Sequence, residues 1–304
     1  MLTLTVVATK GGVGKTTVAV NLGGLLCDLG HRVLFVDADV QPSLTKYFKI
    51  SKAAPNGLTA LVMNGALTPD CVSEIALPPN ENKAADRFAQ PRRRLDLIRS
   101  DTRDGKLQDW LSNRLDRLIR LRMSIMNEAV RARYDVVVID TQGAVGHLQD
   151  AGVNVADLLI APVSPDTLSA REFVDGTLEL LDRHESATSM VGFKVPAMKA
   201  VINKSDHTVN SRTMADLIRE QFIEMRGRVN VLNTQIPSAV AFRNAATEQV
   251  PVHWIDPQRA GDVMHRLLWE LIPSLEGKYA PNHPEFRAAT APPEADGSPS
   301  APSL

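Results

Sequence analysis

The sequence predicts an α/β fold in which helices cover both faces of a doubly wound, mostly parallel sheet. Short apolar runs rich in β-branched residues recur up to about residue 240, and a helical stretch separates each run from the next. Most of these runs lack period-two alternation, as expected for parallel strands buried on both faces. The first run enters a Gly-rich turn that leads directly into a helix. Together these features predict a single α/β domain.

The predicted elements follow one another in a regular order. The first strand spans residues 2–8, and a helix of small and apolar residues follows from Thr16 to about Leu29, where Gly30 ends it. A last core helix is predicted over residues 264–275, with Pro273 near its end. Six further strands are predicted at Val33–Asp37, Leu95–Ile98, Asp135–Ile139, Leu158–Val163, Met198–Asn203 and Val231–Ile236.

One long amphipathic helix is predicted between Asp104 and Arg133, because apolar residues recur there at helical spacing. Its polar face is rich in arginine. Residues 83–133 contain 14 Lys/Arg and 7 Asp/Glu, a net charge of +7. The charge of the whole chain, −1, therefore conceals a basic segment and does not exclude a nucleic-acid partner.

Composition limits the class of protein. The 304 residues are 44% hydrophobic, enough for a packed core, and contain two cysteines, too few for a disulfide framework or a zinc site. The sequence has no apolar run long enough for a membrane span and no signal-type leader. We therefore expect a cytoplasmic protein with no membrane partner. We also expect a domain over residues 1–275 and a disordered tail, rich in Pro, Ala and Ser, over residues 276–304.

The strongest functional signal is a phosphate-binding loop between the first strand and the first helix, Lys10-Gly11-Gly12-Val13-Gly14-Lys15-Thr16-Thr17. Glycines allow backbone N–H groups to converge on phosphate oxygens, and the helix N-terminus favours negative charge. Lys15 is expected to contact the β- and γ-phosphates, and Thr16 to place its hydroxyl on Mg²⁺. The loop is a variant, because Thr9 stands where the standard pattern has its first glycine.

This loop resembles the deviant Walker A motif of the ParA/MinD group of ATPases, and Phe35-Val36-Asp37-Ala38-Asp39-Val40-Gln41 resembles the second motif of that group. The resemblance covers about residues 1–275 and implies a P-loop NTPase fold with ATP and Mg²⁺ as cofactors. It also implies that Lys10 crosses a dimer interface to the partner's nucleotide, so that ATP produces a sandwich homodimer.

Three carboxylates follow predicted strands and should lie at the carboxyl edge of the sheet, where parallel α/β folds bind ligands. By resemblance, Asp39 positions or activates the attacking water, Asp37 lies near the Mg²⁺ shell, and Asp140, which ends a Walker B-like strand, holds Mg²⁺ through water. Asp37 and Asp39 could instead be turn or cap residues.

The sequence after Asp140 departs from the ParA/MinD group, which usually has Asp-x-Pro-Pro here. This chain has Asp140-Thr141-Gln142-Gly143, so that Gln142 could orient water or be an exposed loop residue.

The identity of the nucleotide base, adenine or guanine, is predicted less directly. Asn203-Lys204-Ser205-Asp206 matches a guanine-reading pattern and keeps GTP open as an alternative. Lys10 favours the ATPase branch, in which an Asn at the position of Asn203 contacts adenine. The segment around Ile236 and Pro237 is expected to line the base pocket.

The branch of the group is chosen by elimination. The chain lacks the cluster cysteines of nitrogenase-type relatives, a basic amphipathic membrane helix at its end and a helix-turn-helix ahead of the phosphate loop. The remaining branch partitions a plasmid, chromosome or integrated mobile element. Its expected partners are non-specific DNA and a ParB-like centromere-binding protein, and the ATP-bound protein is expected on the nucleoid. The alternative is a positioning or regulatory switch that recruits a protein complex without DNA. Candidate DNA contacts are Arg92–Arg94, the arginine face of the predicted long helix (Arg114, Arg117, Arg120, Arg131 and Arg133), Arg212, Arg219, Arg226 and Arg228.

Overall fold

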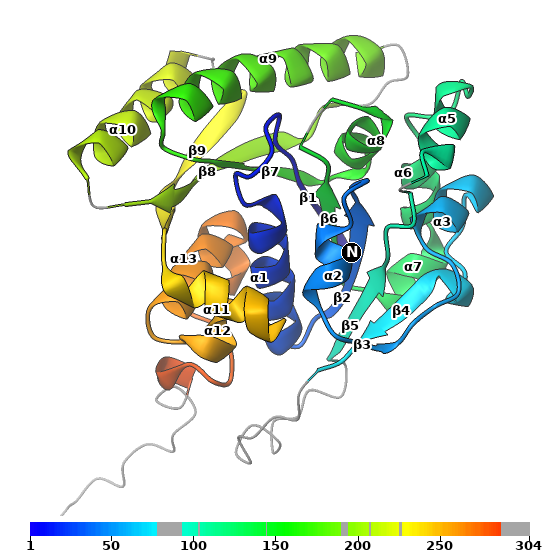
Figure 1. The fold of residues 1–304 in the computed structure, drawn as a ribbon, viewed down its shortest axis with the longest axis horizontal. Coiled ribbons are helices and arrows are strands. Elements are labelled where there is room, and N and C mark those ends of the chain that lie inside the picture. The colour runs from blue at the N-terminus through cyan, green and yellow to red at the C-terminus, as the bar shows by residue number, and fades with distance from the viewer. Residues whose placement is uncertain are drawn as a thin grey trace, which may run out of the picture.

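The computed structural model describes residues 1–77, 93–102, 104–143, 145–189, 194–206, 208–224 and 227–286. Over this part of the chain, one sheet of nine strands forms the centre of the molecule, in the order β3-β4-β5-β2-β6-β1-β7-β8-β9 (Figure 1). Helices cover both of its faces. The predicted fold class, a doubly wound and mostly parallel sheet in one domain, is confirmed.

The seven predicted strands are all present. The sequence analysis missed β3 and β4, which pair antiparallel at one edge of the sheet, whereas the other strand pairs are parallel. Both are short, and β3 is largely exposed, so neither has the apolar run that marked the others. The strands are β1 Leu2–Val6, β2 Arg32–Ala38, β3 Ile50–Lys52, β4 Val72–Ile75, β5 Arg94–Ile98, β6 Val136–Thr141, β7 Leu158–Val163, β8 Ala197–Ser205 and β9 Val229–Pro237.

Successive strand residues contribute to different cores. On β2, Val33 and Phe35 pack with α1, α12 and α13, whereas Leu34 and Val36 pack with α3 and α5–α8. A third cluster joins α9 and α10 to β7 and β8. The helices are α1 Lys15–Asp28, α2 Ser43–Tyr47, α3 Leu58–Asn64, α5 Lys106–Ser112, α6 Arg120–Ile125, α7 Glu128–Arg133, α8 His147–Val155, α9 Thr167–Ser189, α10 Val209–Glu224, α11 Val240–Glu248, α12 Val252–Ile255 and α13 Ala260–Leu271, with 3₁₀ turns at Pro69–Cys71 and Pro273–Leu275.

The helix that follows the first strand lies against the sheet as predicted. A Cβ on Gly23 would lie 2.3 Å from the Phe35 ring, so only glycine permits this close packing of α1 on β2. Gly30 has φ +93° just beyond the helix, a conformation that favours glycine, and it ends α1 as expected.

The predicted long helix over residues 104–133 is wrong. The chain forms three short helices, α5, α6 and α7, with turns at residues 113–119 and a new helix start at Asn127, whose side chain accepts a hydrogen bond from Val130 N. Leu115, which helical spacing would place on the apolar face, is instead fully exposed in the first turn. Periodicity alone could not reveal these breaks, because the apolar spacing continues across them while Asn127 offers a cap that restarts the helix.

The last helix, α13, buries Met264, Leu267, Leu268 and Leu271 against the core, in agreement with the sequence analysis. Packing continues into the first part of the predicted tail, since Ala280 is fully buried and its N–H donates to His265 Nε2 (2.9 Å). The tail from residue 287 onward lies outside the described residues, as do residues 78–92. None of the described helices is long and apolar enough to cross a membrane.

We expect His265 to make folding sensitive to acid. The fully buried ring donates from Nδ1 to Gly261 O (2.8 Å) and accepts at Nε2, so only the neutral form satisfies both bonds. Burial lowers the pKa of His265 from 6.5 to about 4. Between these values the unfolded chain binds a proton that the folded chain does not, so the free energy of unfolding should fall as pH drops through this window, by up to about 3 kcal/mol.

Urea unfolding without nucleotide at about pH 7.5, 5.5 and 4.5 would measure this effect. His265→Gln removes the titrating ring and keeps an acceptor for Ala280 N–H, so its stability should fall less steeply over the same range. Equal losses in the wild type and the variant would contradict the assignment.

Candidate functional site

The candidate site lies at the carboxyl ends of β1, β2 and β6, neighbouring parallel strands near the middle of the sheet (Figure 1). Residues 7–14 connect β1 to α1 here, and Asp37 of β2 pairs in register with Asp140 of β6. Strand order therefore brings together a loop and two carboxylates that lie far apart in the sequence. This edge is where open α/β sheets bind ligands.

The Gly-rich loop has the backbone that its sequence predicts. Gly12 and Gly14 have φ +77° and +93°, and Gly14 is the residue before the first turn of α1. Two side chains that follow each other at the end of β8 hold the loop: Asn203 Nδ2 donates to Val13 O (2.7 Å), and Lys204 Nζ donates to Gly12 O (2.6 Å). Lys204 itself adopts φ +61°, which directs its side chain to the loop at a strained position.

Thr16 and Asp140 meet beside this loop. Thr16 Oγ1 donates to Asp140 Oδ2 at 2.6 Å, and the Asp140 side chain is 1% exposed. Burial, and next the charge of Asp37, raise the pKa of Asp140 to about 7. Its other oxygen, Oδ1, accepts no hydrogen bond from any described residue. A buried carboxylate with a free oxygen beside a hydroxyl fits a hard cation such as Mg²⁺.

The protein alone would not complete a metal shell here. In the part of the chain that the structure describes, no three His, Cys, Asp or Glu residues are grouped to hold a metal ion. Mg²⁺ commonly keeps several waters and takes phosphate oxygens, so one carboxylate and one hydroxyl are a sufficient protein contribution. The arrangement therefore suits a metal that arrives with a phosphate ligand.

The two aspartates after β2 both make local backbone contacts. Asp37 is fully buried and accepts from Thr45 N (2.7 Å) and Asp39 N (3.3 Å), and burial raises its pKa to about 6. Asp39 accepts from Gln41 N (2.9 Å) and is partly exposed at the rim of the site. Both residues therefore act as turn residues, one of the two possibilities that the sequence left open. That Asp39 positions water and that Asp37 lies near Mg²⁺ remain predictions.

Lys15 and Lys10 differ in their surroundings. Lys15 is 8% exposed at the start of α1, and its charge lowers the pKa of nearby Asp140. Lys10 lies at the rim, where its Nζ is 2.7 Å from Glu172 Oε2 on α9, in a half-exposed ion pair. Sequence reasoning did not single out Glu172, because nothing in the pattern of α9 indicates which acidic residue faces the loop.

The predicted base-binding residues are adjacent, since Asn203 pairs with Ile236 and Ser205 with Pro237. Asn203 is 3% exposed and directs its amide at the phosphate loop. Asp206, the carboxylate of the guanine-type pattern, accepts from Thr208 N (2.9 Å) and from the Thr208 hydroxyl. Asn203 and Lys204 thus help to hold the phosphate loop, and Asp206 caps the turn before α10.

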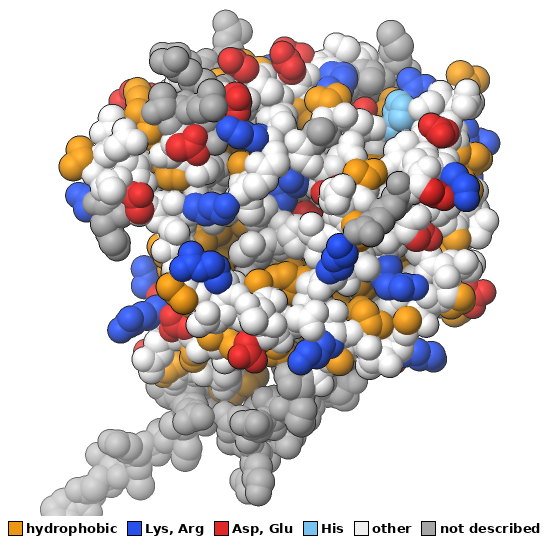
Figure 2. All heavy atoms as spheres, in the orientation of Figure 1, with side chains coloured by type: hydrophobic (Ala, Val, Ile, Leu, Met, Phe, Trp, Pro, Cys, Tyr) orange, Lys and Arg blue, Asp and Glu red, His pale blue; other side chains and the backbone are white. Residues whose placement is uncertain are grey.

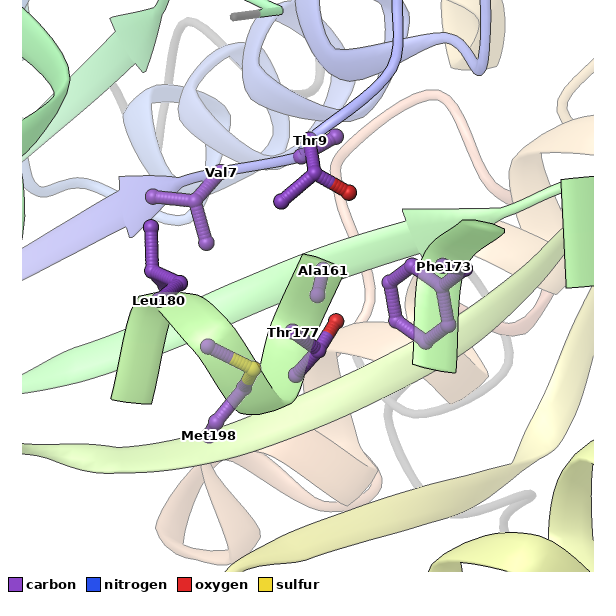
Figure 3. A pocket seen from close by; sticks show the side chains of 8 residues that line it. Val7, Thr9, Ala161, Phe173, Thr177, Leu180 and Met198 are labelled. Carbon is purple, nitrogen blue, oxygen red and sulfur yellow. The ribbon is translucent and has the colours of Figure 1, made fainter. Parts of the chain in front are cut away.

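A small pocket lies behind the phosphate loop (Figure 3). Thr9 forms part of its wall at the end of β1, opposite Phe173 and Thr177 of α9. The Thr9 hydroxyl is buried without a hydrogen bond to any described residue, and a Cβ on Gly176 would lie 2.5 Å from it. The remaining walls are mostly aliphatic, so the pocket is a packing feature behind the loop.

The arginines predicted to contact DNA are largely paired within the chain. Arg114 binds Asp116 through Nε and Nη2 (2.6 and 2.9 Å), Arg117 and Arg120 donate to backbone carbonyls, and Arg228 pairs with Asp182. On the face drawn in Figure 2, Lys and Arg side chains stand singly among neutral and acidic ones. Ion pairs also hold Arg93, Arg94 and Arg219, whereas Arg92 and Arg226 lie outside the described residues.

Comparisons with known proteins agree with this geometry. A family model described as an AAA domain matches residues 1–185. The sporulation initiation inhibitor protein Soj of Bacillus subtilis is 27% identical over 255 residues, which cover 83% of this chain and 90% of Soj. The probable plasmid-partitioning protein ParA of Thermus thermophilus is 28% identical over 270 residues, covering 86% of this chain and 75% of that protein.

Solved structures show the same fold. Apo McdA of Cyanothece superposes with a TM-score of 0.72 at 20% identity, covering 89% of this chain and 99% of McdA. The septum site-determining protein MinD of Pyrococcus horikoshii, complexed with Mg-ADP, superposes with a TM-score of 0.62 at 16% identity, covering 90% of this chain and 97% of MinD.

Proposed function

Because the chain belongs to the AAA-domain family and, within it, to the ParA/MinD group of P-loop ATPases, we propose that it is a partition ATPase controlled by ATP and Mg²⁺. The observation that carries the proposal is the Thr16–Asp140 hydrogen bond at the start of α1, beside a buried lysine. This bond brings together two motifs that lie far apart in the sequence, the phosphate loop and the end of β6. Together they supply the residue types that phosphate and Mg²⁺ require.

In the proposed mechanism, the loop N–H groups and Lys15 hold the β- and γ-phosphates. Thr16 directly and Asp140 through water would hold Mg²⁺, which would neutralise charge on the phosphate oxygens. Asp39, at the exposed rim, orients the attacking water, and Asp37 supports the turn that presents Asp39. Loose transition states for phosphoryl transfer need positioning more than covalent help, so these few groups suffice.

We propose ATP rather than GTP as the nucleotide. Asp206, which would read guanine, already accepts two hydrogen bonds from Thr208, and Asn203 and Pro237 remain the proposed base-side residues. Structures named as a McdA(D38A)–ATP complex and as MinD with Mg-ADP support the same nucleotide class. Competition of ATP and GTP for the purified protein would decide between the two bases.

We propose that ATP joins two chains into a homodimer in which Lys10 reaches the partner's nucleotide. Lys10→Ala should weaken ATP-dependent dimerisation at least about tenfold, because a charge facing a phosphate across an interface is lost. Glu172→Gln removes the Lys10–Glu172 ion pair and should leave dimerisation intact or up to about threefold stronger, since a half-exposed pair contributes little. Light scattering with Mg²⁺ and a slowly hydrolysed ATP analogue measures both, and an unchanged dimer population in Lys10→Ala would refute the role in trans.

The proposed cargo interaction is non-specific DNA, with a ParB-like protein stimulating hydrolysis and the ATP-bound protein on the nucleoid. Relatives named for partitioning support this reading. The alternative, an ATP-dependent positioning switch without DNA, is favoured by the internal pairing of the arginines and by the similarity to McdA and MinD. We place the end of the ATPase domain, predicted at residue 275, near residue 286, because Ala280 is buried and donates to His265 of α13.

DNA binding separates the two functions. We expect the ATP form to bind duplex DNA of arbitrary sequence, with affinity falling at least about tenfold between 50 and 200 mM salt as counterions are released. The ADP form should bind weakly. Normal ATPase activity with no ATP-dependent DNA binding would instead support the positioning switch.

A further inference from the structure

We propose that Gln149 is a positioning residue for hydrolysis, which links the start of the phosphate loop to the loop after β6. Gln149 lies on α8, is fully buried and takes no part in the mechanism above. Its Nε2 donates to Ala8 O at 2.9 Å and reaches Gln142 O at 3.5 Å. One amide group therefore contacts the residue two positions before the phosphate loop and the residue two positions after Asp140. The inference rests on the proposed ATPase function.

The orientation of this amide is fixed by its surroundings. Both neighbours of Nε2 are carbonyl oxygens, which can only accept, so the NH₂ group must face them. Its two hydrogens match the two carbonyls. The other end of the amide, Oε1, is buried and accepts no hydrogen bond from any described residue. A buried amide with an unused acceptor is poorly explained by packing alone, because an apolar side chain of the same size would avoid that cost.

The two loops that Gln149 links also touch each other directly. A Cβ on Gly143 would lie 3.0 Å from Gly11 N, Gly11 Cα and Lys10 O. A side chain here would press on the phosphate loop, so glycine fits where the group resembled in sequence has a proline. Movement of either loop must be transmitted to the other at this contact.

The unequal distances suggest how the link acts. The 2.9 Å bond to Ala8 O is of normal length, whereas 3.5 Å to Gln142 O is at the limit of a hydrogen bond and can shorten. Nucleotide that draws the phosphate loop inward would move Ala8, and Gln149 would carry the loop after β6 with it. That loop follows Asp140, so its position sets the geometry around the γ-phosphate.

The test uses Gln149→Met, which keeps the volume and removes the donor, and Thr5→Val as a matched control. Thr5 Oγ1 donates to Gly152 O at 2.9 Å, so the control also removes a bond between β1 and α8, away from both loops. We expect Gln149→Met to lower kcat about tenfold or more with KM for ATP changed less than about threefold, and Thr5→Val to leave kcat near wild type. Equal effects of the two variants would reduce Gln149 to a structural role and overturn the proposal.

Two further readouts are independent of folding stability. In Gln149→Glu only the protonated carboxyl can donate to Ala8 O, so kcat relative to wild type should recover as pH falls from about 8 to 6, which Gln149→Met should not do. Hydrogen exchange should show ATP protecting residues 8–16 and 141–149 together in the wild type, but only residues 8–16 in Gln149→Met. Joint protection in the variant would overturn the link. Absence of ATP protection in the wild type would instead refute the proposed ATPase function.

Discussion

Lys15→Ala should lower ATP turnover at least about 100-fold and weaken nucleotide binding, because it removes the buried cation at the start of α1. Lys15 also lowers the pKa of Asp140, which burial has already raised to about 7. Without Lys15, Asp140 would be protonated at a higher pH and less available to a cation. Steady-state ATPase assays and titration with a fluorescent ATP analogue, with and without Mg²⁺, would measure both effects.

Lys106→Ala is the control for this variant. Lys106 is exposed and pairs with Asp104, and the mechanism gives it no role, so its loss should leave turnover near wild type. If Lys15→Ala retained more than about a third of wild-type turnover at unchanged KM, the assignment of Lys15 to the phosphates would be wrong.

Gly14→Ala is expected to weaken nucleotide binding at least about 30-fold, for a reason that the loop motif alone does not provide. The new Cβ would lie 2.2 Å from Asn203 Nδ2, the atom that donates to Val13 O. The variant thus has to displace Asn203 and release the phosphate loop from β8. The φ of +93° adds strain of about 1–2 kcal/mol for a residue with a Cβ.

Gly105→Ala is the control that has the backbone strain of a positive φ without a collision like that between the new Cβ and Asn203. Gly105 also precedes the first turn of a helix with a positive φ, +76°, but a Cβ there meets nothing within 4 Å. It should lower stability by the strain alone and leave nucleotide binding unchanged. Asn203→Ala in the Gly14→Ala background should cost much less affinity than Asn203→Ala in the wild type, because the bond is already lost. Additive losses would contradict the collision.

Much of the site could be predicted from the sequence because its chemistry is local. The phosphate loop needs glycines, a lysine and a threonine at fixed spacing between a strand and a helix, and the structure has that arrangement at residues 10–17. Asp140 was predictable for a similar reason: a buried strand that ends in a carboxylate must place it at the edge of the sheet. The positions of both motifs therefore follow from short segments.

The predictions that failed concerned segments whose structure is not recorded in the spacing of apolar residues. Residues 104–133 have helical spacing throughout, yet Asn127 and the turn at residues 113–119 divide them into α5, α6 and α7. The edge strands β3 and β4 carry too few apolar residues to be recognised, because their pairing partners supply the order. The basic charge of this region was correctly counted, but only the folded chain shows which arginines pair with carboxylates and which donate to backbone carbonyls.

By itself, the sequence determined the fold class, the phosphate loop and the carboxylate that joins it, since each is encoded by residues adjacent in the chain. Only the tertiary structure decided that Asn203 and Lys204 hold the loop, that Glu172 pairs with Lys10, and that Gln149 spans the loop and its neighbour. These side chains act across separations of 141 to 192 residues, where strand order brings them together. No local pattern records such a distance, because it depends on how the whole sheet assembles.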